Sequence, residues 1–539
     1  MQGPADFLIQ QAGELWLGLQ FVAGIVPFLR QSMDAGAALD EIEWRLMNRE
    51  RLFLSFVQDR IFSNPGNPYC VLMNQAGCEA GDLRGLVQSQ GVEGTLRTLY
   101  RSGVYLTVDE FKGRKPVVRG SLTFRTFPAQ FHKSVSGARL KIHTSSSRSH
   151  ESSMPVDFPY IQSRAPNLRA DLMSRKGMDW QHALWGIPGG SAMVHLLEYS
   201  KAGARPVRWF SHVNPASPGL ALRYRWGVRA MRLASLAANR PLPRLQYATV
   251  EDPSPILEWI VQVFRRGAIP HLLTYTSPAV RLCQAAGRSG VSLSGLQMTL
   301  IGEPITAVRL DIIRRSGVNA IPRYGTTESG SIGYGCLRSN EPDDVHFLSD
   351  RLALISDEEG INCPAGSLLV STLLPASPFT LVNASLGDQA VLRDYDCGCP
   401  LQSRGWTRHI QKVRSFEKLT LGGMNFLKSD VSRIMDELLP RRFGGSPTHY
   451  QLVEEEGDDG CPRLLFYIHP AVGEVDPQEV KEAFLQAISQ GKGMERIMGT
   501  VWRDAGMIEV KRQAPVPTMS GKIHHFLRAN IREDKNSRV

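Results

Sequence analysis

From about Gly120 onward, the sequence alternates between short runs rich in β-forming residues and stretches with apolar residues at helical spacing. The clearest of these segments are residues 208–212, 255–266, 271–275, 297–301 and 307–316. Strands that alternate with helices form βαβ units, in which the helices cover a mostly parallel sheet. The alternation therefore predicts an α/β fold built on mostly parallel strands.

Two other regions depart from this pattern. Residues 1–110 read as a helical start, with apolar residues at helical spacing through 41–62 and 83–99. Between Arg351 and Asp394, short β runs are separated by Gly and Pro, which indicates a smaller antiparallel sheet.

The sequence after Trp406 has the pattern of a compact α+β unit. One helix should begin at Asp476 as N-cap, with Pro477 at its first position and Glu479 as the capping acid. Its buried face is expected to hold Val480, Phe484, Ala487 and Ile488, and an earlier helix should bury Val431, Ile434, Met435, Leu438 and Leu439. We predict a large N-terminal domain, residues 1–413, and a small mobile C-terminal domain, residues 414–539.

Charge, hydropathy and cysteine content exclude several classes of protein. The net charge of +10 arises from 62 basic and 52 acidic residues spread along the chain without a Lys/Arg block, so we expect anionic small substrates and no nucleic acid. The longest apolar stretch, residues 15–29, contains Gln20 and Pro27 and is too short to span a bilayer. Eight cysteines are too few for a secreted disulfide scaffold, which favours a cytoplasmic location.

Four short motifs follow one another in a fixed order. They are IGEP at residues 301–304, RYGTTESGSIG at 323–333, LGD at 386–388 and PTMSGKIHHFLR at 517–528. Activation of a carboxylate by ATP needs a seat for adenine and ribose, a phosphate clamp, an acid that holds magnesium, and a cation at the pentacoordinate phosphorus. The four motifs contain candidates for these tasks.

This ordered set resembles the ANL superfamily of acyl-CoA synthetases, peptide-synthetase adenylation domains and luciferases, and within it the phenylacetate-CoA ligase and bioluminescence acyl-protein synthetase branch. The resemblance covers roughly residues 120–530. It implies that ATP activates a carboxylic acid as an acyl-adenylate, which then passes its acyl group to a thiol. Coenzyme A, a carrier-protein phosphopantetheine and a protein cysteine all remain open as the acceptor.

The resemblance also assigns roles to individual residues. The adenine pocket would be formed by two motifs, with the residues Gly302, Glu303, Pro304, Tyr324 and Gly325. Tyr324 would stack on adenine, and the absence of a side chain at Gly302 would let the backbone approach the ring. Each of these residues taken alone also fits a plain turn at the end of a strand.

Further residues would bind the phosphates, the metal and the ribose. The resemblance implies that Thr327 holds the α-phosphate, that Glu328 binds Mg²⁺ and that Asp388 accepts hydrogen bonds from ribose. Lys522, in a Ser-Gly-Lys loop, would enter the site from the small domain and neutralise charge during adenylation. Arg414 would contact ribose beside the hinge; family members usually carry an acid two positions later, where this chain has Phe416 followed by Glu417.

The phosphate loop departs most from the family pattern. Relatives carry a segment such as SSGTTG, whereas residues 143–152 read HTSSSRSHES, with the hydroxyls kept and both glycines gone. The β- and γ-phosphates would here be held by Ser145, Ser146, Ser147 and Arg148, with the guanidinium as a bidentate clamp. The alternative is a non-catalytic or weakly active nucleotide-binding relative with a degenerate loop.

Cys336, His346, Cys397 and Cys399 form a second candidate site. Three thiolates and one imidazole satisfy the preference of zinc for four tetrahedral nitrogen and sulfur ligands, although the spacing is not that of a zinc finger. Some phenylacetate-CoA-ligase-like proteins carry a Cys/His zinc site in this region. We predict a structural zinc site, with free cysteines and a surface histidine as the alternative.

The acid substrate cannot be read from the sequence. The segment that contains Trp185, Trp209 and His212 is expected to help form the wall of the acyl pocket, because aromatic and Gly-rich segments are common there in relatives. Packing in the core explains each tryptophan equally well.

Overall fold

We describe the fold from a computed structural model. It describes residues 20–31, 33–133, 140–143, 153–214, 222–303, 305–339, 341–415, 418–421, 424–427, 434–456, 462–489, 502–503, 506, 508–516 and 526–528.

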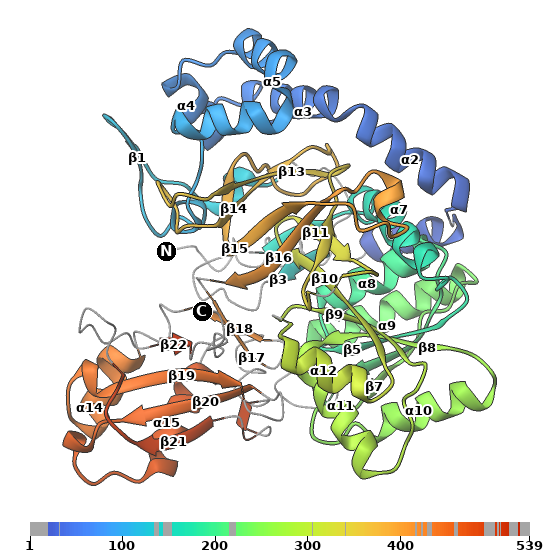
Figure 1. The fold of residues 1–539 in the computed structure, drawn as a ribbon, viewed down its shortest axis with the longest axis vertical. Helices are drawn as coiled ribbons and strands as arrows, with labels where there is room; N and C mark the ends of the chain where they lie inside the picture. The colour runs from blue at the N-terminus through green and yellow to red at the C-terminus, as the bar shows by residue number, and fades with distance from the viewer. Residues whose placement is uncertain are drawn as a thin grey trace, which may run out of the picture.

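The N-terminal part of the described chain is a series of helices, as predicted, and those over residues 35–101 lie at one end of the molecule (Figure 1). After a helix over residues 20–30, they are α2 (Ala35–Met47), α3 (Arg49–Val57), α4 (Pro68–Gln75), α5 (Ala80–Arg101) and α6 (Val108–Phe111). Local sequence fixes their ends: the Asp34 carboxylate accepts a hydrogen bond from the Gly36 amide, 2.8 Å away, at the start of α2.

The middle of the chain contains the predicted βαβ units. Its parallel strands are β5 (Gln181–Gly186), β6 (Pro206–Ser211), β7 (Leu245–Tyr247), β8 (Pro270–Tyr275), β9 (Gln297–Ile301) and β10 (Asn319–Thr326). The helices around and between them are α7 (Phe158–Ser174), α8 (Gly190–Lys201), α9 (Leu222–Ala237), α10 (Ser254–Arg265), α11 (Thr276–Arg288) and α12 (Ala307–Arg315). In α10 the buried residues Ile256, Ile260 and Val263 recur at helical spacing, which places one apolar face on the sheet.

The antiparallel strands expected between Arg351 and Asp394 are present, and they continue the large sheet instead of forming a separate one. This half contains β11 (Gly330–Gly335), β12 (Val345–Phe347), β13 (Leu352–Asp357), β14 (Ser367–Thr372), β15 (Ala384–Asp394) and β16 (Arg408–Ser415). The twelve strands follow the order β13-β14-β15-β16-β12-β11-β10-β9-β8-β5-β6-β7. Three hairpins lie apart from it: β1 (Val117–Arg119) with β2 (Leu122–Phe124), β3 (Leu140–His143) with β4 (Ser153–Val156), and β17 (Lys418–Leu421) with β18 (Met424–Leu427).

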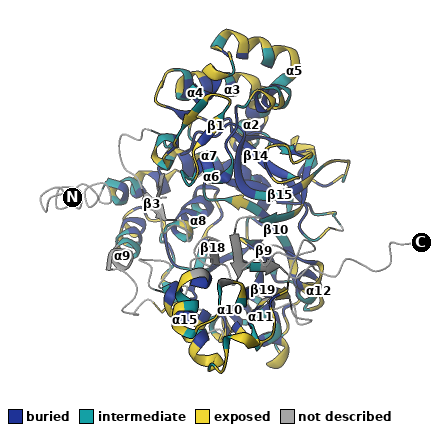
Figure 2. Cartoon of the chain, turned by 90° about the vertical axis from the view of Figure 1, so that its left-hand side faces the viewer, coloured by how far each residue is buried: buried dark blue, intermediate teal, exposed yellow. Residues whose placement is uncertain are grey.

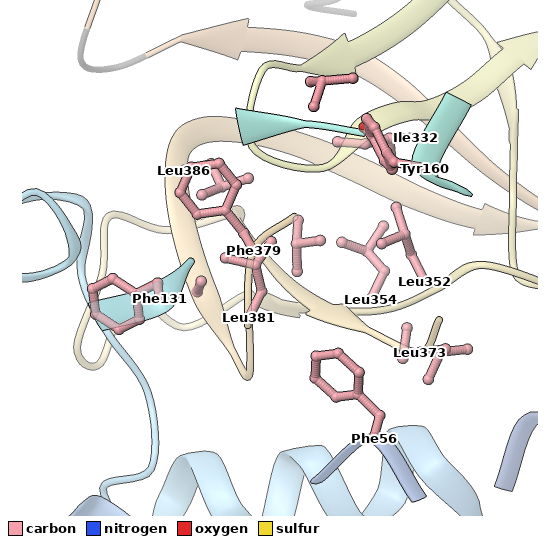
Figure 3. Packing of buried hydrophobic residues seen from close by; sticks show 14 of the residues in the cluster. Phe56, Phe131, Tyr160, Ile332, Leu352, Leu354, Leu373, Phe379, Leu381 and Leu386 are labelled. Carbon is pink, nitrogen blue, oxygen red and sulfur yellow. The ribbon is translucent and has the colours of Figure 1, made fainter. Parts of the chain in front are cut away.

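The largest core joins the N-terminal helices to the antiparallel strands. Phe56 of α3 faces Leu373 and Leu354 of the sheet region, while Phe379 and Leu381 fill the space farther along (Figure 3). Strand β14 and the first residues of β15 are buried, whereas the outer faces of α3, α4 and α5 are exposed (Figure 2). Burial of this apolar surface is the main free-energy gain of the fold.

The C-terminal part has its own four-stranded sheet, in the order β21-β20-β19-β22. Its elements include α14 (Leu439–Phe443), β19 (Tyr450–Glu456), β20 (Pro462–Ile468), α15 (Pro477–Ser489), β21 (Ile508–Arg512) and β22 (Phe526–Arg528). The predicted face of α15 is buried, and the Asp476 carboxylate accepts from the Gln478 amide at 2.9 Å. Of the earlier face, Ile434, Met435 and Leu439 are buried and Leu438 is half-buried, while Val431 lies outside the described residues.

Within the described part of the chain, no helix has the length and apolarity needed to cross a bilayer.

Candidate active site

The carboxyl ends of β8 and β9 meet at a closely packed turn. Gly302 follows β9 with a φ of 72°, and a Cβ at this position would lie 2.9 Å from two ring carbons of Tyr275, the last residue of β8. A Cβ at Gly186, the last residue of β5, would lie 3.2 Å from the same ring. Tyr275 thus fits between two glycines. It was not predicted as a site residue, because only its position at the end of a strand distinguishes it in the sequence.

Glu303 is occupied by contacts within the protein. Its carboxylate accepts hydrogen bonds from the amide of Ser277, at 2.8 Å, and from the Ser277 hydroxyl, and it lies 3.8 Å from Arg309. Because Ser277 is in the first turn of α11, the carboxylate is also stabilised by the helix N-terminus. Glu303 therefore holds α11 and α12 against the turn after β9. Pro304 lies outside the described residues.

Tyr324 and Asp388, from two different motifs, are in direct contact. The Tyr324 hydroxyl donates a hydrogen bond of 2.9 Å to Asp388 Oδ2. Burial, together with this neighbouring carboxylate, raises the pKa of Tyr324 well above its usual value, so the phenol keeps its proton. In the order of the sheet, β16, β12 and β11 separate β15 from β10, so the sheet must curve for the two side chains to meet.

The turn between β10 and β11 presents Thr327 and Glu328 beside this pair. Gly325 is required there, because a Cβ would lie 2.4 Å from the Gly330 carbonyl oxygen. Glu328 is only 8% exposed, and its carboxylate has no hydrogen bond or ion pair with the other described residues. A buried carboxylate without a partner is unfavourable unless a cation binds, so an oxygen-seeking ion such as Mg²⁺ fits this position.

Arg414 is fixed on the strand next to Asp388. Its Nη1 lies 2.9 Å from Asp343 Oδ2, and Asp343 also accepts hydrogen bonds from the amides of Lys412 and Val413. Because β15 and β16 pair with Asp388 opposite Ser415, Arg414 and Asp388 lie on neighbouring strands. Asp343 was not predicted as a site residue, because nothing in the sequence links it to Arg414, which follows 71 residues later.

A buried ion network lies directly behind the Tyr324 strand. Glu198 of α8 is fully buried and accepts from Arg164 at 2.8 Å and from Arg323 at 2.9 Å. Arg323 also donates to the Ser331 hydroxyl, so one side chain ties β10 to β11. Burial alone would raise the pKa of Glu198, but the two arginines hold it well below its usual range. The network fixes the hairpin that carries Tyr324 and Glu328.

The four side chains predicted to bind zinc converge. The ligand atoms of Cys336, His346, Cys397 and Cys399 all lie within 4.8 Å of one another. His346 Nε2 lies 3.0 Å from the Cys399 sulfur, and its Nδ1 lies 2.6 Å from the carbonyl oxygen of Trp406. A hydrogen bond from Nδ1 to a carbonyl is the usual arrangement of a metal-binding histidine, because it points Nε2 at the metal.

Two further contacts order the cysteines of this cluster. The Cys336 thiol donates to Cys399, which raises the pKa of Cys336 and lowers that of Cys399. The Cys-Gly-Cys turn is closed by Gln402, whose Oε1 accepts from the amides of Cys397 and Gly398 at 2.9 and 2.7 Å. The set of donors is that of a closed structural zinc site.

The aromatic residues expected near the acyl pocket differ in their surroundings. Trp185 and Trp209 are each 1% exposed and pack in the core. His212 is also buried, 5.1 Å from Trp185 and 6.0 Å from Tyr275 between ring centres, and both its nitrogens lack a hydrogen-bond partner in the described structure. Burial lowers the pKa of His212 to about 3, so the ring is neutral near pH 7.

Six candidate residues have no structural description. They are Ser145, Ser146, Ser147 and Arg148 of the phosphate loop, Pro304, and Lys522, all of which lie outside the described residues together with Phe416 and Glu417.

No protein-family model matches this sequence, and no curated protein sequence matches it. Among solved structures, a 2-hydroxyisobutyryl-CoA ligase in complex with 2-HIB-AMP and CoA is similar, with a TM-score of 0.52 and 13% identity over 93% of this chain and 91% of that chain. The chain therefore shares the fold of this CoA ligase.

Two further structures are similar with lower scores. An amide bond synthetase from Marinactinospora thermotolerans has a TM-score of 0.41 and 12% identity, over 93% of this chain and 97% of that chain. A malonyl-CoA ligase complex with methylmalonyl-CoA and AMP has a TM-score of 0.40 and 13% identity, over 70% of this chain and 71% of that chain.

Proposed function

We propose that this protein uses ATP to convert a carboxylic acid into an acyl-adenylate and then transfers the acyl group to a thiol. The observation that carries the proposal is the 2.9 Å hydrogen bond between Tyr324 and Asp388, which joins two motifs 64 residues apart. Glu328, a buried carboxylate with no partner among the described residues, lies in the turn that follows Tyr324.

Tyr324, Asp388 and Arg414 would bind the nucleoside in this proposal. The aromatic ring of Tyr324 offers a stacking surface, and its hydrogen bond holds the ring in one orientation. Asp388 would accept hydrogen bonds from ribose hydroxyls, beside Arg414 on the neighbouring strand. Glu303 contributes through the turn it stabilises, because its carboxylate is already bound by Ser277.

The first half-reaction is attack on the α-phosphorus of ATP by an oxygen of the substrate carboxylate. The new oxygen–phosphorus bond forms as the bond from the α-phosphorus to the bridging oxygen breaks, and pyrophosphate leaves. Thr327 would hold the α-phosphate and Glu328 would hold Mg²⁺, which neutralises phosphate charge when bound. Lys522 and Arg148 would supply the remaining positive charge near the phosphates.

The second half-reaction transfers the acyl group. A thiolate attacks the acyl carbon, the bond to the phosphate oxygen breaks, and AMP leaves with that oxygen. Coenzyme A, a carrier-protein phosphopantetheine and a protein cysteine are the candidate acceptors. His212 is neutral and lies at the carboxyl end of β6, so it can line the acyl pocket without placing a charge beside the acid.

The test is acid-dependent exchange of radioactive pyrophosphate into ATP, screened over aromatic and fatty acids. Asp388→Ala should raise the KM for ATP about tenfold, because a hydrogen bond to a charged group is lost. Asp394→Ala is the matched control: this residue lies on the same strand in an exposed pair with Arg408, and its loss should leave KM unchanged.

Two outcomes would separate the alternatives. ATP binding without exchange for any acid would support a non-catalytic nucleotide-binding protein, which the altered phosphate loop favours. Equal effects of Asp388→Ala and Asp394→Ala would remove Asp388 from the nucleotide site. If exchange is found, release of AMP on addition of free coenzyme A identifies that acceptor, whereas labelling of a protein identifies a protein acceptor.

A further inference from the structure

A cleft of about 690 Å³ lies on the opposite edge of the parallel strands from the candidate active site. It is lined by residues at the amino ends of β5, β6 and β7 and near the end of α9. Because these strands are parallel, their carboxyl ends, with Gly186 and Ser211, lie at the other edge, where Tyr275 and Gly302 also lie. The cleft is therefore separate from the site proposed for adenylation.

Four arginines line this cleft, and they have no acidic partner among the described residues. Arg205, Arg208, Arg232 and Arg244 face it, with Asp179 as the acidic residue of the lining. None of the four forms an ion pair with any described side chain, in contrast to the paired arginines of the core. The Nε of Arg232 is buried and has no hydrogen-bond partner in the part of the chain that the structure describes.

The sequence around the cleft contains an unusual excess of positive charge. Between Glu198 and Glu251 there is no acidic residue, while nine basic residues occur: Lys201, Arg205, Arg208, Arg223, Arg225, Arg229, Arg232, Arg240 and Arg244. These residues form no contiguous Lys/Arg block, so their concentration in one region is not evident from the sequence alone. Like charges around a concave surface repel one another, and an anion bound between them relieves that repulsion.

The wall of the cleft is rigid. Trp180, which lines the cleft, is 7% exposed and packs against Arg175, 4.9 Å from its ring centre, and against His271, at 5.5 Å between rings. The Nδ1 atom of His271 lies 3.0 Å from the Nδ1 atom of His182, which is on the neighbouring strand. Packed aromatic rings behind mobile cationic side chains give a preformed pocket with a polar rim, which is the usual form of a small-molecule site.

We propose that this cleft binds a ligand that carries a phosphomonoester or diphosphate group. Several guanidinium groups around one cavity match a multiply charged phosphate, since each can offer two parallel N–H donors to its oxygens. The volume suits a small molecule or a single lipid headgroup. Both sources present the same chemistry, so the experiment must distinguish them.

The first experiment measures pyrophosphate binding by titration calorimetry to the full-length protein saturated with the non-hydrolysable analogue α,β-methylene-ATP, so that the proposed adenylation site is already occupied. Arg205→Gln with Arg244→Gln removes two exposed cleft arginines that have no other described contact. Arg265→Gln with Arg266→Gln is the matched control, because it removes the same charge from exposed positions at the end of α10, outside the cleft. We expect binding to weaken about tenfold or more in the cleft variant alone.

A second experiment measures sedimentation with phosphatidylcholine vesicles, with and without phosphatidylinositol phosphate. Pyrophosphate binding lost only in the cleft variant supports a free phosphate ligand. Sedimentation with the phosphoinositide vesicles that is lost only in the cleft variant supports a lipid headgroup. If neither probe binds, or if both double variants respond alike, the proposal is overturned. Pyrophosphate exchange into ATP should be the same in all three proteins, since no active-site residue is changed.

Discussion

Glu328 shows how a single residue can be identified from its environment. A carboxylate that is 8% exposed and has no described partner carries an uncompensated desolvation cost in the absence of a cation. A bound magnesium ion would offset that cost, in keeping with the metal-binding role proposed for Glu328.

Replacement of Glu328 by Gln keeps the shape of the side chain and removes its charge. We expect Glu328→Gln to lower magnesium-dependent adenylation about 100-fold, while ATP binding without metal stays within about twofold, because only the metal contact is lost. Glu359→Gln, at an exposed position, is the control. Equal losses in adenylation and in metal-free ATP binding would mean that Glu328 is structural.

Lys522 is assigned from its Ser-Gly-Lys motif, and it lies outside the described residues. We expect Lys522→Ala to reduce adenylation by about 100-fold or more, because it removes a charge that acts mainly in the transition state. The temperature of unfolding should stay the same, since a charge contact made only during the reaction contributes little to folding. Unchanged pyrophosphate exchange in this variant would refute the proposed role.

At the level of elements, the β10–β11 hairpin depends on the ion network of Glu198. One carboxylate neutralises two buried arginines from α7 and β10. Glu198→Ala leaves both unpaired, and we expect the free energy of unfolding to fall by about 3–5 kcal/mol. Glu251→Ala, which breaks only the exposed pair with Arg281, should cost less than about 1 kcal/mol. Urea unfolding measures the free energy of unfolding of both variants. Similar losses in the two variants would show that the Glu198 network is not needed for stability.

The Cys/His cluster joins the segment after β11, strand β12 and the turn between β15 and β16. We expect the purified protein to contain about one equivalent of zinc by metal analysis, because four ligands of the right chemistry already converge. Cys397→Ser should release the metal and lower the unfolding temperature, since a metal that binds only the folded state stabilises it. Cys363→Ser changes a buried cysteine away from the cluster and should keep the zinc. Protein purified without chelator that holds no zinc would rule the site out.

Local pattern predicted the elements better than their contacts. Strand β9 has the predicted bounds, 297–301, because a buried apolar run ends at a glycine that its turn requires. The contact between Tyr324 and Asp388 could not be read from the sequence, because it depends on the curvature of the sheet. The same holds for Asp343 and Glu198, whose arginine partners are 71 and 125 residues away. The four candidate zinc ligands could be picked out in the sequence because thiols and imidazole are chemically distinctive, and the structure brings their side chains together.

At the scale of the whole molecule, the small C-terminal sheet has a hydrophobic core of its own. It is centred on β19, β20 and α15, while Ile187 and Val213, which follow β5 and β6 of the large sheet, pack against it. A domain with its own core can fold alone and can move relative to its neighbour. The boundary at residues 413 and 414 stays a prediction, and it can be tested by cutting the chain.

A chain that ends at Ser415 would keep β16 intact and remove the small sheet together with Lys522. We expect this shortened protein to unfold in one cooperative transition, because the cores around β5–β16 do not depend on the small domain. It should bind ATP, since Tyr324, Asp388 and Arg414 remain, but it should not form acyl-adenylate. Calorimetric unfolding, ATP titration and pyrophosphate exchange measure the three properties on one preparation. Aggregation of the shortened chain would show that the two parts fold together, and retained exchange would show that the small domain is not needed for adenylation.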